Sequence, residues 1–195
     1  IFEGRWIQAE LGPVFVKDTW LPLDHRHGAV PLGALLSLPR ELLSIVCRGI
    51  ETPSPRRLGF FDSETTGVSG GTGTYVFLAC LGSFEEDGFR VRHYFLADLG
   101  GERAMLHALA ADLDRMEGIV TYNGRAFDLP LLESRCSLAR LPRPRENRPH
   151  LDLLHTVRRL FGQQMESCRL QEAEAHILDF HRVGDVPSHL VPSIF

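Results

Sequence analysis

The chain has 195 residues, enough for one well-buried core, and its hydrophobic and charged fractions of 44% and 24% are ordinary for a globular domain. No apolar run is long enough to cross a bilayer, and the four cysteines lie tens of residues apart, which argues against a membrane span and a disulfide scaffold and favours a cytoplasmic location. The net charge of −4 disfavours indiscriminate coating of nucleic acid. Because the chain begins with Ile1 and lacks the layout of a signal peptide, we expect it to be part of a longer protein.

The first 57 residues predict an extension that precedes the main domain. Short apolar stretches surround a Gly-Pro turn and predict a hairpin, and the spacing of Leu, Ile and Val after it predicts a helix that begins near Pro39. Residues 51–57 carry proline and serine and are typical of a linker. We therefore expect an extension over residues 1–57 and a second domain over residues 58–195.

From residue 58 the pattern becomes regular. It predicts strands at 58–64, 74–84, 89–98 and 118–123, and helices at 101–116, 127–137, 150–162 and 169–178. The first three strands form a meander, and the order β-β-β-α-β-α-α-α predicts an α/β fold in which helices flank a mixed central sheet.

Two carboxylates stand at the end of the first of these strands. Residues i and i+2 of a strand emerge on one face about 6.5–7 Å apart, so Asp62 and Glu64 point the same way. At about 5 Å and an effective dielectric constant near 20, like charges repel by about 3 kcal/mol. Mg²⁺ or Mn²⁺ would relieve this repulsion and suits oxygen ligands. If the strand instead ends at Phe61, both acids lie solvated in a turn.

Two further acids complete a candidate metal site. Asp128 follows the strand 118–123 in the first turn of a helix, and it would face Asp62 and Glu64 if the two strands are neighbours in the sheet. Asp185 lies late in the chain, after the last predicted helix. The alternatives are an ordinary first-turn acid, favoured by the helix dipole, and a plain turn aspartate before proline.

These motifs carry a family resemblance. FDSETTG, TYNGRAFD and the late Asp185 resemble the three motifs of the DEDD superfamily of ribonuclease H-like 3′–5′ exonucleases. The segments RRLGFFDSETTG, FLACLGSFEEDGF, VTYNGRAFDLPLLESR, HLDLLHTVRRLF and VGDVP resemble, in order, those of the YprB-like ribonuclease H-like family. The likeness spans residues 58–187, and His27-Gly28 resembles what precedes the domain in those relatives.

The resemblance implies a fold, an activity and a set of residues. It implies a ribonuclease H-like fold and a metal-dependent 3′–5′ exonuclease that hydrolyses phosphodiester bonds of DNA or RNA with two divalent ions, Mg²⁺ or Mn²⁺. Asp62, Glu64, Asp128 and Asp185 would hold the ions. Contacts with the terminal nucleotide would come from Thr66, Gly67, Val68 and Asn123.

His181 departs from the pattern of the family. It lies four residues before Asp185, where relatives have a Tyr, whereas their His lies five residues before the last Asp. A histidine is able to act as general base near neutral pH, so His181 is a candidate for this role; a His at the edge of a strand or loop is the alternative. We interpret Asp152, a fifth acid, as a carboxylate at a helix start.

Arginines are concentrated between residues 133 and 160, a window that contains seven arginines and three acidic residues. We expect this window, from Arg135 to Arg159, to bind the phosphate backbone of a nucleic acid, because guanidinium groups match phosphate geometry. Within it, Arg143, Arg145 and Arg148 are the candidate substrate-binding residues. A solvated face is the alternative. Two other functions stay open: a nucleic-acid-binding module with a degenerate site, and a structure-specific endonuclease on the same fold.

Overall fold

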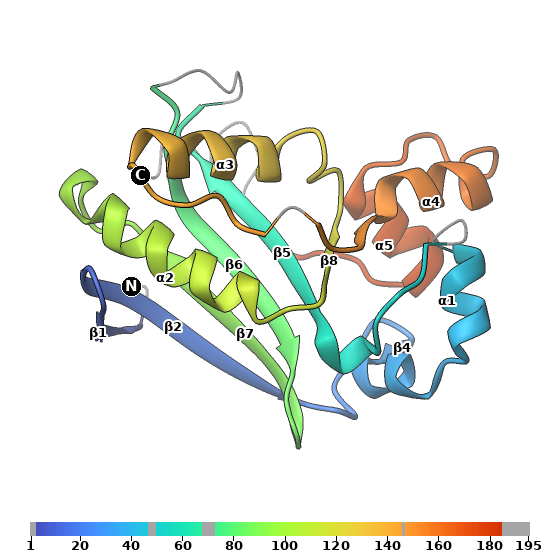
Figure 1. The fold of residues 1–195 in the computed structure, drawn as a ribbon. Helices are drawn as coiled ribbons and strands as arrows, with labels where there is room; N and C mark the ends of the chain where they lie inside the picture. Colours follow the sequence, from blue (N-terminus) through green and yellow to red (C-terminus); the bar gives the residue numbers. More distant parts are fainter. Residues whose placement is uncertain (1–2, 47–49, 68–72, 146, 185–195) are drawn as a thin grey trace.

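The computed structural model describes residues 3–46, 50–67, 73–145 and 147–184. At its centre is a mixed sheet of seven strands in the order β1-β2-β7-β6-β5-β8-β9 (Figure 1). The strands are β1 (Arg5–Ala9), β2 (Gly12–Pro22), β5 (Leu58–Thr65), β6 (Val76–Phe84), β7 (Gly88–Phe95), β8 (Gly118–Thr121) and β9 (His150–Asp152). Strands β5, β6 and β7 form an antiparallel meander, whereas β5, β8 and β9 run parallel.

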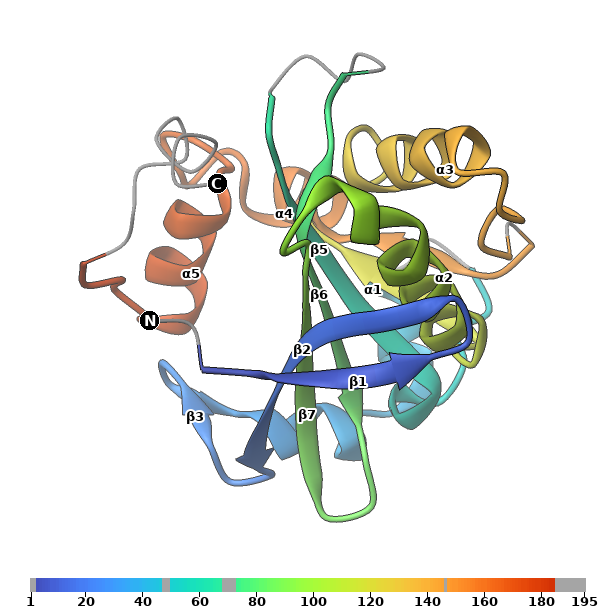
Figure 2. The ribbon, with the colours of Figure 1, turned by 90° about the vertical axis from the view of Figure 1, so that its left-hand side faces the viewer.

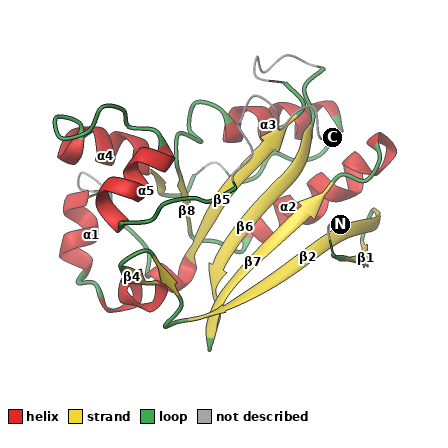
Figure 3. Ribbon diagram, turned by 180° about the vertical axis from the view of Figure 1, so that it is seen from behind, coloured by secondary structure: helices red, strands yellow, loops and turns green. Residues whose placement is uncertain are grey.

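Helices cover both faces of this sheet. Helices α2 (Glu102–Asp114) and α3 (Asp128–Leu138) lie on one face, and α5 (Leu170–Leu178) lies on the other (Figure 2). Helices α1 (Arg40–Val46), α4 (Leu153–Phe161) and α5 gather beside β8 (Figure 3). The mixed sheet with flanking helices confirms the predicted α/β architecture. Among the described residues, no helix combines the length and apolar character needed to cross a membrane.

The core explains why the central strands are so apolar. β8 is buried along all four of its residues, as expected for a parallel strand that is covered on both faces. The main core joins Phe61 of β5 and Leu81 of β6 to Leu109 of α2 and Leu132 of α3. A smaller cluster on the opposite face contains Leu58, Val120 and Leu151. Side chains of β5 therefore alternate between the two faces of the sheet, as the pleat of a strand requires.

The prediction for residues 150–162 was wrong at its first three residues. His150–Asp152 form the strand β9, which pairs in parallel with β8, and the helix α4 begins only at Leu153. A three-residue strand has no periodicity of its own, so the helical pattern that follows it obscured it. The observed order from β5 onward gains one strand between α3 and α4.

The predicted N-terminal hairpin is confirmed, and the structure shows that it is part of the central sheet. β2 pairs with β7 along its length, from Phe15 opposite Phe95 to Pro22 opposite Gly88, so the hairpin extends the central sheet. The chain then forms a small hairpin of β3 (Arg26–His27) and β4 (Val30–Pro31), the 3₁₀ turns η1 (Leu32–Ser37) and η2 (Pro55–Arg57), and between them α1. A third 3₁₀ turn, η3 (Leu99–Gly101), leads into α2. The division into an extension and a main domain stays a prediction.

A buried ion pair joins the two helices of one face. Nε of Arg135 on α3 donates to Glu102 Oε1 and its NH2 group donates to Oε2, both at 2.6 Å, and Glu102 begins α2. The same guanidinium lies 4.0 Å above the ring of Tyr75. Both charged side chains are nearly inaccessible, at 6% for Arg135 and 12% for Glu102. A pair of this kind is costly to break because either partner alone is an uncompensated buried charge.

Replacing Arg135 by Ala is therefore expected to lower the free energy of unfolding by about 3–5 kcal/mol. Urea denaturation measures this loss. Arg103→Ala is the matched control, because Arg103 is exposed on the same helix as Glu102, and it should change stability by less than about 0.5 kcal/mol. Equal losses for the two variants would contradict a special role for the buried pair.

Candidate active site

A cleft of about 1030 Å³ lies where β5 and β8 end. Asp62 and Glu64 of β5 line it together with Asn123, which follows β8. Since parallel strands end at the same edge of a sheet, the pairing of β5 with β8 brings these distant segments together. The opposite wall comes from α4, α5 and the chain between them, including Arg158, Cys168 and Arg169.

Asp62 is the acid most affected by its surroundings. It is exposed at the cleft surface, yet its pKa is raised from the ordinary 3.8 to about 6, first by loss of hydration and then by the negative charge of Asp128. Arg182, which also lines the cleft, acts in the opposite direction. The Asp62 carboxylate therefore lies in a position where negative charge is disfavoured and a cation is favoured.

Asp128 begins α3 and approaches β5 from the face of the sheet that α3 covers. Its Oδ1 accepts a hydrogen bond of 2.6 Å from the hydroxyl of Ser63, the residue between Asp62 and Glu64. Burial raises the pKa of Asp128, the hydrogen bond from Ser63 lowers it, and the charge of Asp152 raises it further. Asp128 thus lies beside the two acids of β5, and its Oδ1 is engaged by the strand itself.

Asp152 holds the loop that leads from β8 to Asp128. It is buried, and both of its carboxylate oxygens accept hydrogen bonds from backbone N–H groups: Asn123 at 2.7 Å and Leu154 at 3.2 Å on Oδ1, and Arg125 at 3.0 Å on Oδ2. The predicted carboxylate at a helix start is confirmed, because Asp152 caps α4. The structure also shows that Asp152 holds the backbone of Asn123. The φ of Asn123 is +67°, a conformation that few non-glycine residues adopt.

The segment that follows β5 contains three of the residues that were predicted to contact the terminal nucleotide. The Thr66 hydroxyl accepts a hydrogen bond from the Tyr75 backbone N–H at 2.9 Å, and the Gly67 carbonyl accepts one of 2.9 Å from Thr65. Both contacts fix the base of the loop between β5 and β6. Val68 and Asp185 lie outside the described residues. Substrate contacts by Thr66, Gly67 and Asn123 stay predictions.

His181 is exposed. Its Nε2 lies 3.5 Å from Asp179 Oδ1, and the two side chains are 73% and 86% accessible. Among the described residues it is not one of those that line the cleft. Its role as a general base stays a prediction, and the position observed here does not add to its support.

The three predicted phosphate-binding arginines line a separate hollow of about 580 Å³ beside the N-terminal half of α3. Arg148 is 6% accessible and donates hydrogen bonds to the carbonyls of Leu113 and Met116, so it holds the end of α2 in place. Arg143 donates to the Ser137 hydroxyl at 3.3 Å. Arg143 and Arg145 are exposed. The acidic cleft itself is lined by Arg158, which belongs to the predicted arginine-rich window, and by Arg169 and Arg182, which the sequence analysis missed.

A buried glutamate positions Arg182. Glu174 on α5 receives hydrogen bonds from Arg182 at 2.6 Å and 3.2 Å, and its Oε1 lies 3.2 Å from His27 Nε2. The His27 ring stacks on Phe180 at 3.8 Å between centroids. The neighbouring Gly28 has a φ of +62°, and a Cβ atom there would meet the Leu178 carbonyl oxygen at 2.0 Å. His27 and Gly28 therefore connect the N-terminal segment to the wall of the cleft.

The chemistry of the acids fits a divalent cation. Among the described residues, no group of three or more His, Cys, Asp and Glu side chains is arranged to hold a metal ion. Asp62 and Glu64, however, open to one cleft, and the pKa of Asp62 is raised in part by the charge of Asp128. Carboxylate oxygens are the ligands that Mg²⁺ and Mn²⁺ prefer, and a cation here would relieve the repulsion.

Comparison with known proteins identifies the family. Residues 59–195 match the model of the RNase_H superfamily, so the chain belongs to the ribonuclease H superfamily, and its mixed sheet with flanking helices is a ribonuclease H-like fold. The chain is 33% identical over 185 residues to the uncharacterized protein YprB of Bacillus subtilis (strain 168), an alignment that covers 92% of this chain and 44% of that protein. This likeness is consistent with the predicted YprB-like family.

The raised pKa of Asp62 predicts a pH-dependent effect of Asp62→Asn on stability. A raised pKa means that the folded state favours the protonated carboxyl. The stability that the protonated Asp62 carboxyl contributes is therefore complete below about pH 4 and is lost as the pH rises through about 6. In EDTA, Asp62→Asn should be more stable than the natural chain at pH 8, by about 1 kcal/mol once solvent screening is allowed for. The gain should vanish towards pH 4.

Urea denaturation at both pH values measures this difference. The control is Asp179→Asn, because the Asp179 side chain is 86% accessible and the change of charge is the same. A gain that is independent of pH would contradict the raised pKa of Asp62.

Gly28→Ala should lower the free energy of unfolding by at least about 2 kcal/mol, because the left-handed conformation is strained for alanine and its Cβ would collide with a backbone oxygen. Thermal and urea unfolding measure the loss. Gly184→Ala is matched for conformation, since Gly184 has a φ of +72° but nothing within 4 Å of the added atom. A smaller loss at Gly28 than at Gly184 would show that the contact with Leu178 is unimportant.

Proposed function

We propose that this chain is a metal-dependent 3′–5′ exonuclease of the DEDD type, which hydrolyses phosphodiester bonds of DNA or RNA by a two-metal mechanism. The observation that carries the proposal is the cleft in which Asp62 and Glu64 face Arg158, Arg169 and Arg182. Acids on one wall can hold cations, and guanidinium groups on the other can bind the phosphate that the cations flank. We further propose that the protein acts in the cytoplasm.

Each acid of the proposed site has a place in this scheme. Asp62, Glu64, Asp128 and Asp185 would hold two ions, Mg²⁺ or Mn²⁺, which when bound make a water molecule a better nucleophile and stabilise the departing oxygen. Asp128 can offer its second oxygen, since Oδ1 accepts from Ser63.

The other residues orient the substrate. Glu174 holds Arg182 in place, and the positive charge of Arg182 lowers the pKa of Asp62. The Tyr122 hydroxyl donates to the Cys168 carbonyl at 2.6 Å and so ties the end of β8 to the opposite wall of the cleft. Asn123 would present its amide to the terminal nucleotide from a loop that Asp152 keeps in place.

Asp62→Asn and Asp128→Asn are each expected to reduce Mn²⁺-dependent hydrolysis of a 5′-labelled oligonucleotide by about 10³-fold, because removal of a metal ligand costs several kcal/mol of transition-state stabilisation. Asp179→Asn should retain activity, since that carboxylate is exposed beside His181. Mn²⁺ should also raise the melting temperature of the natural chain and of Asp179→Asn, and leave that of Asp62→Asn unchanged.

Substrates with a blocked 3′ end separate the possible activities. A 3′–5′ exonuclease should stop at the block, whereas an endonuclease should continue to cut. Tight binding of the oligonucleotide without any hydrolysis would instead indicate a binding module with a degenerate site. Hydrolysis that survives both Asp62→Asn and Asp128→Asn would refute the proposed role of these acids.

A further inference from the structure

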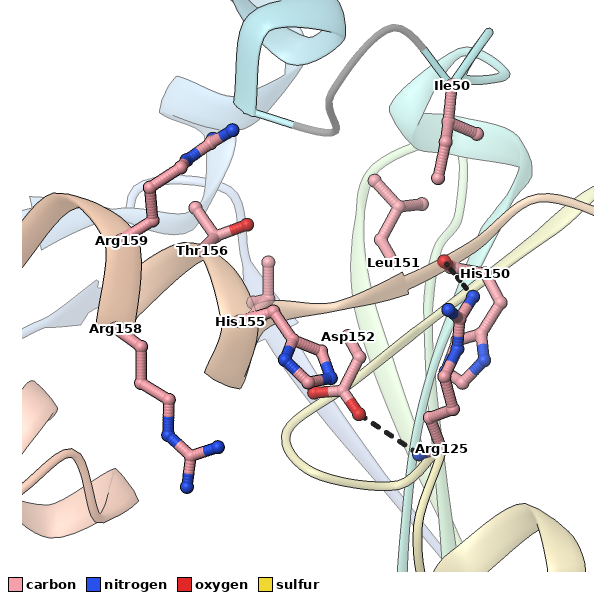
Figure 4. Close-up of a pocket in the computed structure, with 10 residues that line it drawn as sticks. Ile50, Arg125, His150, Leu151, Asp152, His155, Thr156, Arg158 and Arg159 are labelled. Atoms are coloured by element: carbon pink, nitrogen blue, oxygen red, sulfur yellow. Dashed lines mark hydrogen bonds between the residues drawn. The ribbon is translucent and has the colours of Figure 1, made fainter.

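A third hollow lies next to the acidic cleft, at the start of α4 (Figure 4). Its volume is about 490 Å³, and we call it the arginine hollow. Apolar side chains of Ile50, Leu151 and Leu153 contribute to its lining. The basic residues that line it are Arg125 from the loop after β8 and Arg158 and Arg159 from α4.

The arginine hollow is continuous with its neighbours on both sides. Arg158 lines both the arginine hollow and the acidic cleft. Arg125 and His150 line both the arginine hollow and the hollow that contains Arg143 and Arg145. The three hollows therefore follow one another along β9, from the residues that precede it to the cleft at the end of β5 and β8, and Arg125 and Arg158 stand at the two junctions.

The charge of the arginine hollow is positive. Asp152 is the one acid among the described residues that line it, and its carboxylate is buried and accepts three backbone hydrogen bonds. The Arg125 side chain is exposed, and its Nη2 makes a long contact of 3.5 Å with the His150 carbonyl. Arg158 and Arg159 are exposed on α4. Figure 4 shows the two α4 arginines extending from the helix in different directions.

We propose that the arginine hollow binds an internal nucleotide of a single-stranded nucleic acid whose 3′ end lies in the acidic cleft. This inference rests on the proposed function, which it deepens by assigning the path of the strand. A volume of about 490 Å³ is within the range of pockets that take small organic groups. The base lies against the apolar side chains, and the flanking phosphates lie between Arg125 and Arg159. A positively charged groove that follows the backbone is the part of sequence-tolerant single-strand binding that the arginines supply.

The experiment measures binding without hydrolysis, in the Asp62→Asn background and with EDTA present. The probes are 5′-fluorescein oligothymidylates and oligouridylates of 2 to 12 nucleotides, and the tighter series is used. Fluorescence anisotropy gives the Kd for each length and its dependence on salt. The test variant carries Arg125→Ala and Arg159→Ala. The control carries Arg115→Ala, because the Arg115 side chain is 74% accessible and does not line any of the three hollows.

The double variant should bind the 12-mer about tenfold more weakly, and the slope of log K against log salt should fall by about 1.4, which corresponds to two lost phosphate contacts on a single strand. Its affinity for the dinucleotide should equal that of the control, because the dinucleotide occupies the acidic cleft alone. Ile50→Glu, at a position that is 38% exposed, should weaken the 12-mer in the same length-dependent way by repelling the phosphates.

Three results would overturn the proposal: an unchanged Kd for the 12-mer, an equal loss for the dinucleotide and the 12-mer, or displacement of the 12-mer by polyglutamate at equal charge concentration. The last result would indicate an acidic protein as the ligand. Circular dichroism melting confirms that the variants are folded. Mn²⁺-dependent hydrolysis is measured separately with the natural Asp62 in place. Hydrolysis by that chain together with no length-dependent loss of binding in the double variant would refute the arginine hollow alone. The length-dependent loss of binding together with no hydrolysis by that chain would refute the proposed function alone.

Discussion

Parallel pairing of β5, β8 and β9 is the constraint on which the candidate site depends. The pairing of Val120 with Leu151 sets β9 beside β8, and the pairing of Phe60 with Val120 sets β8 beside β5. Three strands from distant parts of the chain consequently end at one edge of the sheet. Asp152 then fixes the segment after β8 through hydrogen bonds to backbone N–H groups, which stay in place whichever side chains occupy those positions.

The electrostatics of this edge follow from the same arrangement. The face of β5 that carries Asp62 and Glu64 is opposite to the one covered by α2 and α3, so these acids open to a cleft instead of the main core. Asp128 stands on the covered side and still raises the pKa of Asp62. Arginines on the far wall compensate part of this negative charge. A site of this kind stores repulsion between carboxylates that a cation can relieve.

The N-terminal segment has structural importance that its position in the chain does not suggest. β2 continues the central sheet next to β7, and His27 contacts Glu174, which in turn holds Arg182 at the cleft. The family model begins only at residue 59, so these contacts lie partly outside the region it matches. The site therefore depends on residues before the region that the family model matches, because His27 contacts the glutamate that holds Arg182.

The sequence by itself determined the meander, the long helices and the pairing of Asp62 with Glu64 on one face, because periodicity and the pleat of a strand are local properties. It also predicted that Asp152 begins a helix. Tertiary structure alone decided that β9 exists, that Asp152 grips the loop of Asn123, and that Arg148 is buried against the end of α2 whereas Arg158 lines the cleft. These features depend on which segments become neighbours in space, and the local sequence around an arginine does not specify which residues its side chain contacts in the folded chain.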